Sequence, residues 1–308
     1  MSGRAGQENA DRGRLQGSMT ALVTPFTAEG KLDEAALERL VAHQQAGGTD
    51  VLVPLGTTGE AVTLDEGEKR RVLKIVRKAA EGTPVMAGAG TNDTRTTIEN
   101  CRMAAGEGAD LVLVVGPYYN KPPQEGFRRH FEAVAEASPV PVVLYNVPGR
   151  TGSNIEAATQ LTLADHPGIV GVKEASGRLD QVAAVLAGRP EGFAVLSGDD
   201  DLTLPLLALG ADGVVSVAAN AVPDLVHDLV AAGLAGRFDQ ARELHFRLRP
   251  LFIAQFTETN PIPIKAATEL LGLAGGGVRL PLTPAADWTR QAVRTAMANL
   301  GRVPPAEV

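Results

Sequence analysis

Lys173 is the residue whose position most directly suggests chemistry. It lies in GIVGVKEAS, 168–176, toward the carboxyl end of a nearly continuous apolar run. If that run is a central strand, the amine cannot easily reach solvent, and burial lowers its pKa. A neutral amine forms an imine with a ketone, and the iminium then draws electrons from the adjacent carbon. A strand lysine in an ion pair with Glu174 or an aspartate is the alternative, and position alone leaves both open.

Tyrosine and arginine side chains follow the neighbouring runs. Tyr145 ends the run before that of Lys173, so its phenol can act as a general acid or base there, unless it only caps the core. Arg150, five residues later, has a guanidinium that matches a carboxylate, unless it is simply solvated. Tyr118 and Tyr119 are adjacent in GPYYNKPP, so one can face inward and the other a partner subunit.

Two glycine-rich segments follow other apolar runs. GTTGE, 56–60, encloses Thr57 and Thr58 between glycines, so backbone N–H groups and hydroxyls can hold a small anion such as a carboxylate. An ordinary strand-to-helix turn is the alternative. GAGTND, 88–93, lacks the third glycine of a dinucleotide-binding fingerprint, and we predict no nucleotide site there.

Metal-binding patterns are not visible in the sequence. The five histidines are dispersed over expected helices or their ends: His43, His130, His166, His227 and His245. We expect Asp199–Asp201 of SGDDD to cap the next helix rather than to bind Mg²⁺. The G-x-S-x-G pattern of serine hydrolases is also absent. The predicted chemistry is therefore metal-free.

Eight short apolar runs are the elements that would position these residues. They span 19–25, 50–56, 84–90, 109–116, 140–148, 168–176, 193–200 and 211–220. Nearly continuous, β-branched runs are typical of parallel strands covered on both faces. Helical patterns such as 33–48 and 65–82 lie between them, with acidic starts and glycine ends.

Eight strand–helix units without a break predict an α/β fold, a (β/α)8 TIM barrel, with a doubly wound open sheet as the alternative. Polar or glycine-rich residues follow each strand, where the active sites of such barrels lie. We predict a flexible tail at 1–17, a barrel at 18–236 and a C-terminal helical domain at 237–308, with helices near 237–254, 261–272 and 285–299.

Composition excludes several classes of protein. The 308 residues carry a net charge of −7 and no long basic run, which disfavours nucleic-acid binding. No apolar stretch approaches the roughly 18 residues of a membrane span, so we expect a cytoplasmic protein without a membrane partner. Cys101 is the one cysteine, so no intramolecular disulfide forms, and we expect it to be a small buried apolar residue.

Seven motifs occur in an order and spacing that resemble one known family. They are GTTGE, GPYYNKP, YNVPGRTG, GVKEAS, SGDD, GVVSVAAN and NPIPIKAA, and the likeness covers about residues 18–284. The family is that of the dihydrodipicolinate synthases and N-acetylneuraminate lyases, which are class I (Schiff-base) aldolases. The resemblance implies a (β/α)8 barrel with a C-terminal helical domain, and a covalent pyruvate–lysine imine in place of any cofactor.

The resemblance also implies roles for single residues. Lys173 forms the imine with pyruvate, and Tyr145 relays protons and helps to position the substrate. Thr57 and Thr58 supply the turn that binds the carboxylate, and Thr58 adds its hydroxyl to the relay. Tyr119 reaches across a dimer contact to complete the relay of a neighbouring subunit.

The pocket and its loops carry the remaining implications. Gly198 and Val215 match positions that line the pyruvate pocket. Arg150 in N-V-P-x-R-T-G matches the arginine that binds the carboxylate of aspartate semialdehyde. The resemblance thus implies condensation of pyruvate with aspartate semialdehyde in lysine and diaminopimelate biosynthesis, by a homo-oligomer, a dimer of dimers. A pyruvate-dependent 2-keto-3-deoxy sugar-acid aldolase is the alternative, and a pyruvate-sensing barrel is disfavoured because Lys173 and Tyr145 are retained.

Regulation by lysine is a further implication of the resemblance. Tyr118 and Asn92 match polar positions that hold the inhibitor in sensitive members. Lys69 stands where those members have a histidine, and Thr96 where they have an acid. An added ammonium and a missing carboxylate disfavour a cationic ligand, so we predict insensitivity to lysine unless Glu66 restores the negative charge.

Overall fold

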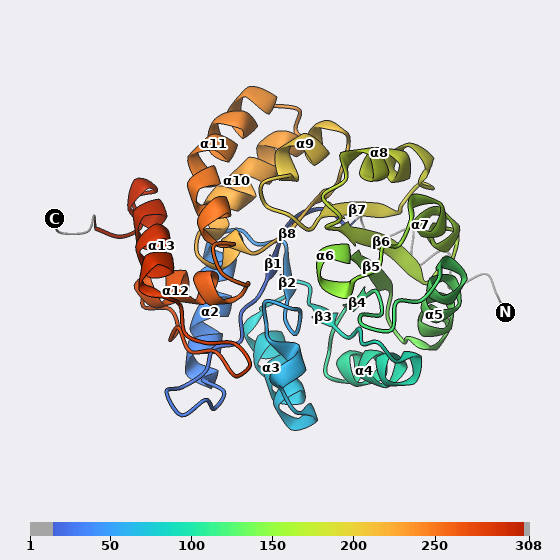
Figure 1. The fold of residues 1–308 in the computed structure, drawn as a ribbon, viewed down its shortest axis with the longest axis horizontal. Coiled ribbons are helices and arrows are strands. Elements are labelled where there is room, and N and C mark those ends of the chain that lie inside the picture. The colour runs from blue at the N-terminus through green and yellow to red at the C-terminus, as the bar shows by residue number, and fades with distance from the viewer. Residues whose placement is uncertain (1–14, 305–308) are drawn as a thin grey trace.

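The strands of the computed structural model, which describes residues 15–304, form one parallel barrel (Figure 1). They are β1 (Gly17–Ala21), β2 (Val51–Val53), β3 (Met86–Gly88), β4 (Leu111–Val115), β5 (Val142–Asn146), β6 (Ile169–Glu174), β7 (Ala194–Ser197) and β8 (Gly213–Ser216). The sheet order is β2-β1-β8-β7-β6-β5-β4-β3, and a parallel bridge between Leu52 and Val85 joins its two edges. The predicted TIM barrel is confirmed, and the open sheet is not.

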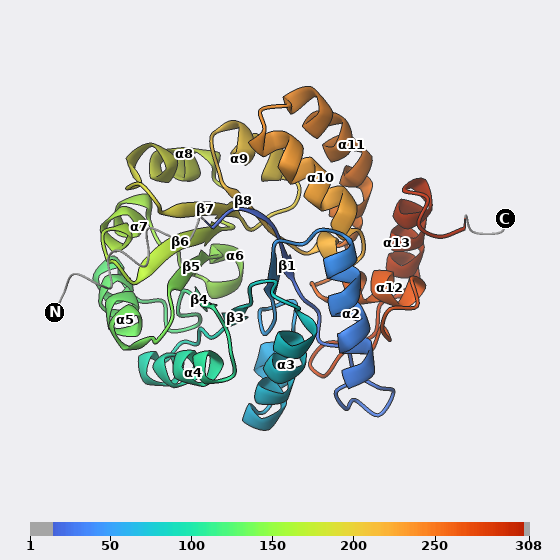
Figure 2. The same ribbon diagram turned by 180° about the vertical axis from the view of Figure 1, so that it is seen from behind.

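A ring of helices surrounds the strands (Figures 1 and 2). The helices of the ring are α2 (Glu34–Ala46), α3 (Glu66–Ala79), α4 (Thr94–Gly106), α5 (Gln124–Ala137), α7 (Ala157–Ala164), α8 (Leu179–Gly188), α9 (Thr203–Ala208) and α10 (Pro223–Leu234). Three short helical turns lie in the loops after strands: η1 (Ala61–Thr63), α6 (Pro148–Thr151) and η2 (Ala218–Asn220). No helix within the described range is long and apolar enough to cross a membrane.

Local sequence explains where several helices begin. Asp33, Asp65 and Asp93 each accept a hydrogen bond from a backbone N–H in the first turn of α2, α3 and α4. Asp65 forms a full capping box with Glu68. These carboxylates satisfy N–H groups that have no partner inside the helix.

Apolar side chains pack in two layers, one on each side of the strands. The outer layer lies between strands and helices and includes Cys101, which is buried as predicted. The inner layer fills the barrel with side chains such as Met19, Met86, Leu113 and Leu196. Because successive side chains of a strand alternate between faces, most strands contribute to both layers, and the barrel interior is a packed core.

Three further helices follow the barrel: α11 (Phe238–Ala254), α12 (Ile262–Leu270) and α13 (Asp287–Asn299). They match the predicted helical segments, and Figures 1 and 2 place α12 and α13 outside the ring, beside α11 and α2. At the other end of the chain, Gly17 already belongs to β1, two residues before the predicted strand. The predicted flexible tail falls almost entirely outside the described residues.

Candidate active site

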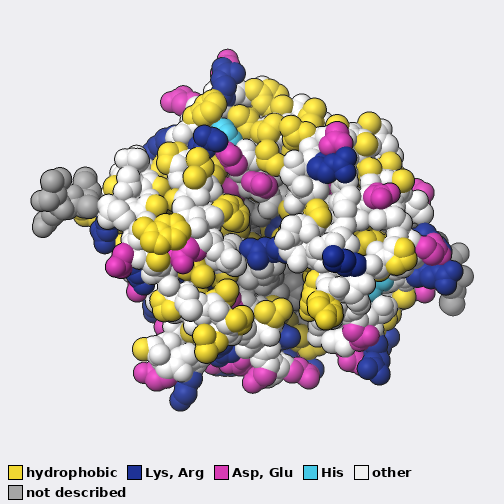
Figure 3. All heavy atoms as spheres, viewed as in Figure 1, with side chains coloured by type: hydrophobic (Ala, Val, Ile, Leu, Met, Phe, Trp, Pro, Cys, Tyr) yellow, Lys and Arg dark blue, Asp and Glu magenta, His cyan; other side chains and the backbone are white. Residues whose placement is uncertain are grey.

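The carboxyl ends of the strands surround a hollow that is visible at the centre of Figure 3. A pocket of about 150 Å³ lies there, between the loops that follow β2, β5, β6 and β7. Its walls include Thr57, Thr58, Tyr145, Arg150, Lys173 and Gly198. The barrel therefore brings most of the predicted site residues together, although they come from positions 57 to 198 of the sequence.

Lys173 lies on β6 at the floor of this pocket, and 5% of its surface is exposed. Its Nζ is 4.2 Å from the centroid of the Tyr145 ring. Burial lowers the pKa of Lys173 to about 8, the nearby negative charge of Asp200 opposes the shift, and the guanidinium of Arg150 adds to it. At pH 7 about a tenth of this amine is therefore neutral, a few hundred times the neutral share of an ordinary lysine, and only the neutral form is a nucleophile.

Glu174 does not pair with Lys173, because the two side chains leave the strand on opposite faces. The Glu174 carboxylate accepts hydrogen bonds from the side-chain amides of Asn146, Gln160 and Gln181, at 2.7 to 3.2 Å. Within residues 15–304, Lys173 makes no ion pair with any carboxylate. The interpretation of Lys173 as a salt-bridged strand lysine is therefore wrong.

Gly198 follows β7 and leaves room for the lysine side chain. A Cβ atom at this position would lie 2.7 Å from Cβ of Ala175 and 3.0 Å from Cε of Lys173. Real Cβ contacts are longer, so any larger residue would displace the lysine or its strand. Glycine at 198 thus fixes the space through which Lys173 reaches the pocket.

Tyr145 is the last residue but one of β5 and is almost fully buried beside Lys173. Burial raises the pKa of Tyr145 to about 12, and Arg150 and a hydrogen bond with the Thr57 side chain both lower it. The phenol therefore stays protonated at neutral pH and can donate a proton. The hydroxyl beside it is that of Thr57, whereas Thr58 was expected in the relay.

Thr58 is held by a residue that the sequence did not point to. Asn260, at the start of α12, donates a hydrogen bond from Nδ2 to the Thr58 hydroxyl at 2.9 Å. The loop itself closes through hydrogen bonds from Gly59 N–H to Gly56 O and from Glu60 N–H to Thr57 O, at 3.1 and 3.0 Å. The segment is a tight turn whose two threonines face the pocket.

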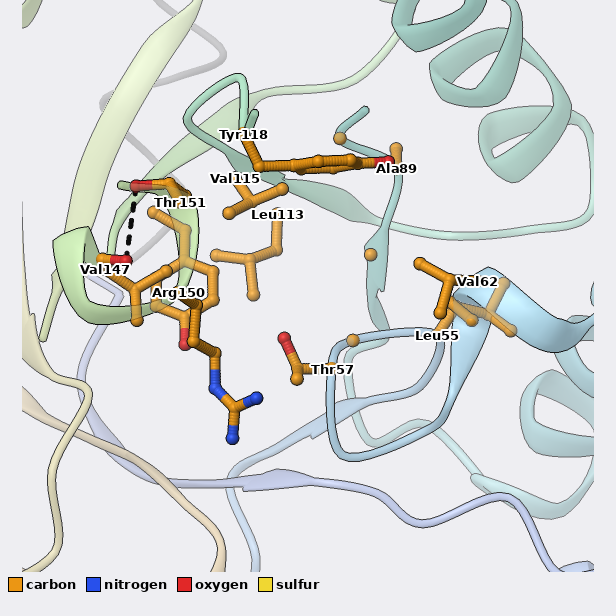
Figure 4. A pocket seen from close by; sticks show the side chains of 15 residues that line it. Leu55, Thr57, Val62, Ala89, Leu113, Val115, Tyr118, Val147, Arg150 and Thr151 are labelled. Atoms are coloured by element: carbon orange, nitrogen blue, oxygen red, sulfur yellow. Dashed lines mark hydrogen bonds between the residues drawn. The ribbon is translucent and has the colours of Figure 1, made fainter. Parts of the chain in front are cut away.

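Arg150 lies on α6, the short turn above the barrel mouth, and is exposed to solvent. Its Nη2 donates to the carbonyl oxygen of Asn260 at 3.4 Å. Figure 4 shows Arg150 and Thr57 extending from different loops toward the same space. A carboxylate in the outer part of the pocket can reach the guanidinium without moving either loop.

Tyr118 and Tyr119 face in different directions. The Tyr118 ring forms one wall of an adjoining pocket of about 250 Å³ that also borders on Thr57 and Tyr145 (Figure 4). Tyr119 is 88% exposed, and its backbone is in the left-handed region at φ 73°. Its backbone N–H donates to Thr151 O at 3.3 Å, but within residues 15–304 its side chain makes no hydrogen bond or ring contact that would explain this conformation.

One expectation about this end of the barrel needs correction. Asp200 does not cap α9: its Oδ2 accepts from Val217 N–H and Ala218 N–H at 3.0 Å and from Gln255 Nε2 at 2.7 Å. It braces the loop after β8, and its charge acts on Lys173. Val217 forms part of the pocket wall, whereas Val215 is buried in the barrel interior with Tyr145 and Leu196.

Known proteins resemble this chain over almost its whole length. The model of the dihydrodipicolinate synthetase family matches residues 14–300. The 4-hydroxy-tetrahydrodipicolinate synthase of Salinibacter ruber is 50% identical over 93% of this chain and 96% of its own. A chloride-inhibited dihydrodipicolinate synthase of Acinetobacter baumannii, solved with pyruvate, superposes with a TM-score of 0.92 at 42% identity, covering 94% and 99% of the chains. The enzyme of Cyanidioschyzon merolae with lysine bound gives 0.91 at 44% identity, again covering 94% and 99%.

Proposed function

This chain belongs to the dihydrodipicolinate synthetase family, and we propose that it works through an imine between pyruvate and Lys173. The reaction is the condensation of pyruvate with L-aspartate 4-semialdehyde to 4-hydroxy-tetrahydrodipicolinate, a lyase reaction of lysine and diaminopimelate biosynthesis. The observation that carries the proposed mechanism is the buried amine of Lys173, which has no carboxylate partner among the described residues and faces a pocket.

Imine formation begins when the neutral amine attacks the keto carbon of pyruvate. Tyr145 donates a proton to the carbonyl oxygen, which leaves as water after a second proton transfer. Loss of a proton from the methyl group then gives an enamine. Thr57, whose side chain interacts with the phenol of Tyr145, and Thr58 are the next members of this relay.

The enamine carbon attacks the aldehyde carbon of the second substrate, and the aldehyde oxygen takes a proton. The amino group of the new adduct then adds to the imine carbon, closes the ring and releases Lys173 as a free amine. Atoms balance without any oxidant or metal, so we propose that no cofactor takes part.

Substrate carboxylates have two separate sites in this proposal. Thr57 and Thr58 bind the carboxylate of pyruvate, and Gly198 gives the space around the imine. Val215 supports this pocket from the layer beneath it. Arg150 binds the carboxylate of aspartate semialdehyde from the pocket mouth.

A second copy of the chain completes the site in this proposal. Tyr119 projects from its loop in a strained conformation, and in an assembly it would reach the relay of a neighbouring subunit. We propose a homo-oligomer built of such dimers, a dimer of dimers, acting in the cytoplasm.

Trapping of the imine tests the mechanism. Borohydride added with pyruvate should inactivate the enzyme and leave one reduced pyruvyl group per chain, on the peptide that contains Lys173. A label on Lys121 or Lys265, or no label, would overturn it. Coupled assays with aspartate semialdehyde and with 2-keto-3-deoxy sugar acids separate the synthase from the sugar-acid aldolase.

Insensitivity to lysine remains part of this proposal, and one contact supports it. Glu66, which could have replaced the missing acid, already pairs with Arg70 at 2.8 Å. Initial rates at saturating pyruvate should stay unchanged as L-lysine rises to about 1 mM, which corresponds to a binding free energy near −4 kcal/mol. Half-inhibition below that concentration would contradict the prediction.

A further inference from the structure

The loop at 56–59, which carries Thr57 and Thr58 and is named the threonine loop, has a strained residue on each side. Contacts with other parts of the protein must therefore hold its backbone conformation. Leu55 and Glu60 flank the loop with φ values of 60° and 51°, in the left-handed region that residues with a Cβ avoid. Such residues persist only where surrounding contacts dictate their conformation. The contacts at Glu60 come from a distant part of the chain.

Glu60 extends into the protein rather than toward solvent. Its carboxylate forms an ion pair with Nζ of Lys265 on α12, and about 1–2% of each side chain is exposed. The same carboxylate accepts from Arg279 N–H at 3.0 Å. Lys265 also donates to Gly277 O at 2.8 Å and lies 4.2 Å from the ring centroid of Phe26. The carboxylate and the ammonium group therefore each have a hydrogen-bond partner besides one another.

Asn260 contacts the same loop from the same C-terminal segment. Its Nδ2 donates to Thr58 Oγ1 at 2.9 Å, so Thr58 and Glu60 are both held by residues of 260–279. The two contacts lie on either side of Gly59, whose carbonyl oxygen accepts from the Thr24 hydroxyl at 2.7 Å. The loop is thus fixed at its side chains and at its backbone.

We propose that the Glu60–Lys265 ion pair, together with Asn260, is a positioning device that holds Thr57 and Thr58 where they bind the carboxylate of pyruvate. Glu60 and Lys265 act through the threonines from outside the pocket, whereas Asn260 also forms part of the pocket wall. The proposal rests on the proposed function, because it needs pyruvate as the ligand of the loop.

A buried ion pair is a poor source of stability, because removing two charges from water offsets most of their attraction. Its advantage is geometric, since it leaves one arrangement of the charged groups at low energy. Here that arrangement fixes the left-handed backbone of Glu60, three residues after Thr57. A device of this kind should affect binding and catalysis beyond its effect on stability.

A second buried ion pair offers a matched control. Arg189 and Asp212 pair where β7 and β8 begin, at the amino end of the barrel, with exposed side-chain fractions of 13% and 5%. Asp212 also accepts from Val195 N–H, so this pair too is embedded in backbone contacts. Both pairs join a cation to a carboxylate with little exposure, although the Arg189 pair is the more exposed of the two, and they lie at opposite ends of the barrel.

The experiment compares Lys265→Met with Arg189→Met in the full chain, at a temperature where both stay folded by circular dichroism. The readout is the pyruvate concentration that half-saturates borohydride inactivation. We expect it to rise at least about tenfold in Lys265→Met and by less than about twofold in Arg189→Met. Equal changes in the two variants would show a structural role only and would overturn the proposal.

Two further variants keep the test decisive if Lys265→Met does not fold. Glu60→Gln with Lys265→Met removes both charges together, and Asn260→Ala removes only the contact to Thr58. Each should raise half-saturating pyruvate while leaving the label on Lys173, and unchanged half-saturation in both would overturn the proposal. Failure of the wild-type protein to be trapped would instead contradict the proposed function, so the two failures are distinguishable.

Discussion

Lys173 and Lys265 are both buried, and burial lowers the pKa of each to about 8. Their surroundings differ. Lys265 faces the Glu60 carboxylate and the Gly277 carbonyl oxygen, whereas Lys173 faces a pocket and has no ion-pair partner within the described chain. Burial alone therefore does not mark a reactive lysine, because the paired amine is fully occupied as a donor. Lys173, the lysine proposed to react, combines burial with open space in front of its nitrogen.

The two environments differ in the free-energy cost of burying the amine. An unpaired buried amine is costly, and such costs are typical of sites that must do chemistry. A paired buried amine leaves little net cost while both partners remain, and a large one when either is lost. The two lysines should therefore respond in opposite ways to replacement.

Replacing each lysine by alanine should give the largest difference in activity between two variants. Lys173→Ala should lower kcat by several orders of magnitude, because no other amine occupies its position. Lys265→Ala should keep measurable turnover and a borohydride label on Lys173. Steady-state rates and peptide mapping check both. Residual turnover in Lys173→Ala close to that of Lys265→Ala would remove the distinction.

Replacing each lysine by methionine should affect stability in the opposite order from activity: the variant at Lys265 should lose more stability than the variant at Lys173. Lys265→Met leaves Glu60 buried without a counter-ion and should cost about 3–5 kcal/mol of the free energy of unfolding. Lys173→Met removes an unpaired amine and should be neutral or stabilising. Urea unfolding at pH 7 measures both, with Glu60→Gln/Lys265→Met expected to recover part of the loss. A larger loss in Lys173→Met than in Lys265→Met would contradict the assignment.

Arg150→Ala tests whether the open space before Lys173 admits a second carboxylate. We expect kcat/KM for aspartate semialdehyde to fall by a factor that corresponds to about 2–4 kcal/mol of lost transition-state binding. That is the range for losing a charge-assisted bidentate contact. Trapping of the pyruvate imine should continue, since the proposed ligand of Arg150 is the carboxylate of the other substrate. Unchanged kinetics would count against aspartate semialdehyde as the second substrate.

The pH dependence of imine formation gives the smallest expected effect. Only the neutral amine attacks, so the rate at low pyruvate should rise with pH and level off above the pKa of about 8. To measure this rate, aliquots of a reaction held at each pH are transferred into borohydride in a single buffer of fixed pH. Arg150→Ala should move the midpoint upward, because the positive charge of Arg150 lowers the pKa of Lys173. A midpoint near 10.5, the ordinary value for lysine, would mean that Lys173 is solvated.

The fold was predictable because local patterns dominate it. Seven of the eight apolar runs contain a whole strand, whereas β1 begins two residues before its run, and the runs differ from the strands mainly at their carboxyl ends. Residues 211–220 were expected to be one strand, yet β8 ends at Ser216. The Asn220 side chain donates to Ala21 O and accepts from Val23 N–H, which draws the backbone into the turn η2. Side-chain hydrogen bonds of this kind leave no periodic signal.

The site was predictable only in part. Lys173 and Tyr145 stand out because they interrupt or end apolar runs, and Arg150 follows closely. Asn260 and the partner of Glu60 could not be found in this way, since they lie more than 200 residues from the groups they hold. Asp200 was misassigned because a run of aspartates before a helix is also typical of a cap. Contacts across the barrel mouth depend on closure of the sheet, which no local window contains.

The contacts to Glu60 also have a consequence for synthesis of the chain. The threonine loop leaves the ribosome early, but Arg279, which bonds to Glu60, is made 219 residues later. At about 5–20 residues per second, that interval is about 10–40 s. For about the last half of it the nascent chain carries Lys173 as well as the threonines, but not the segment that fixes their relative positions. Catalytic competence is therefore acquired at the end of translation, as the last helices dock.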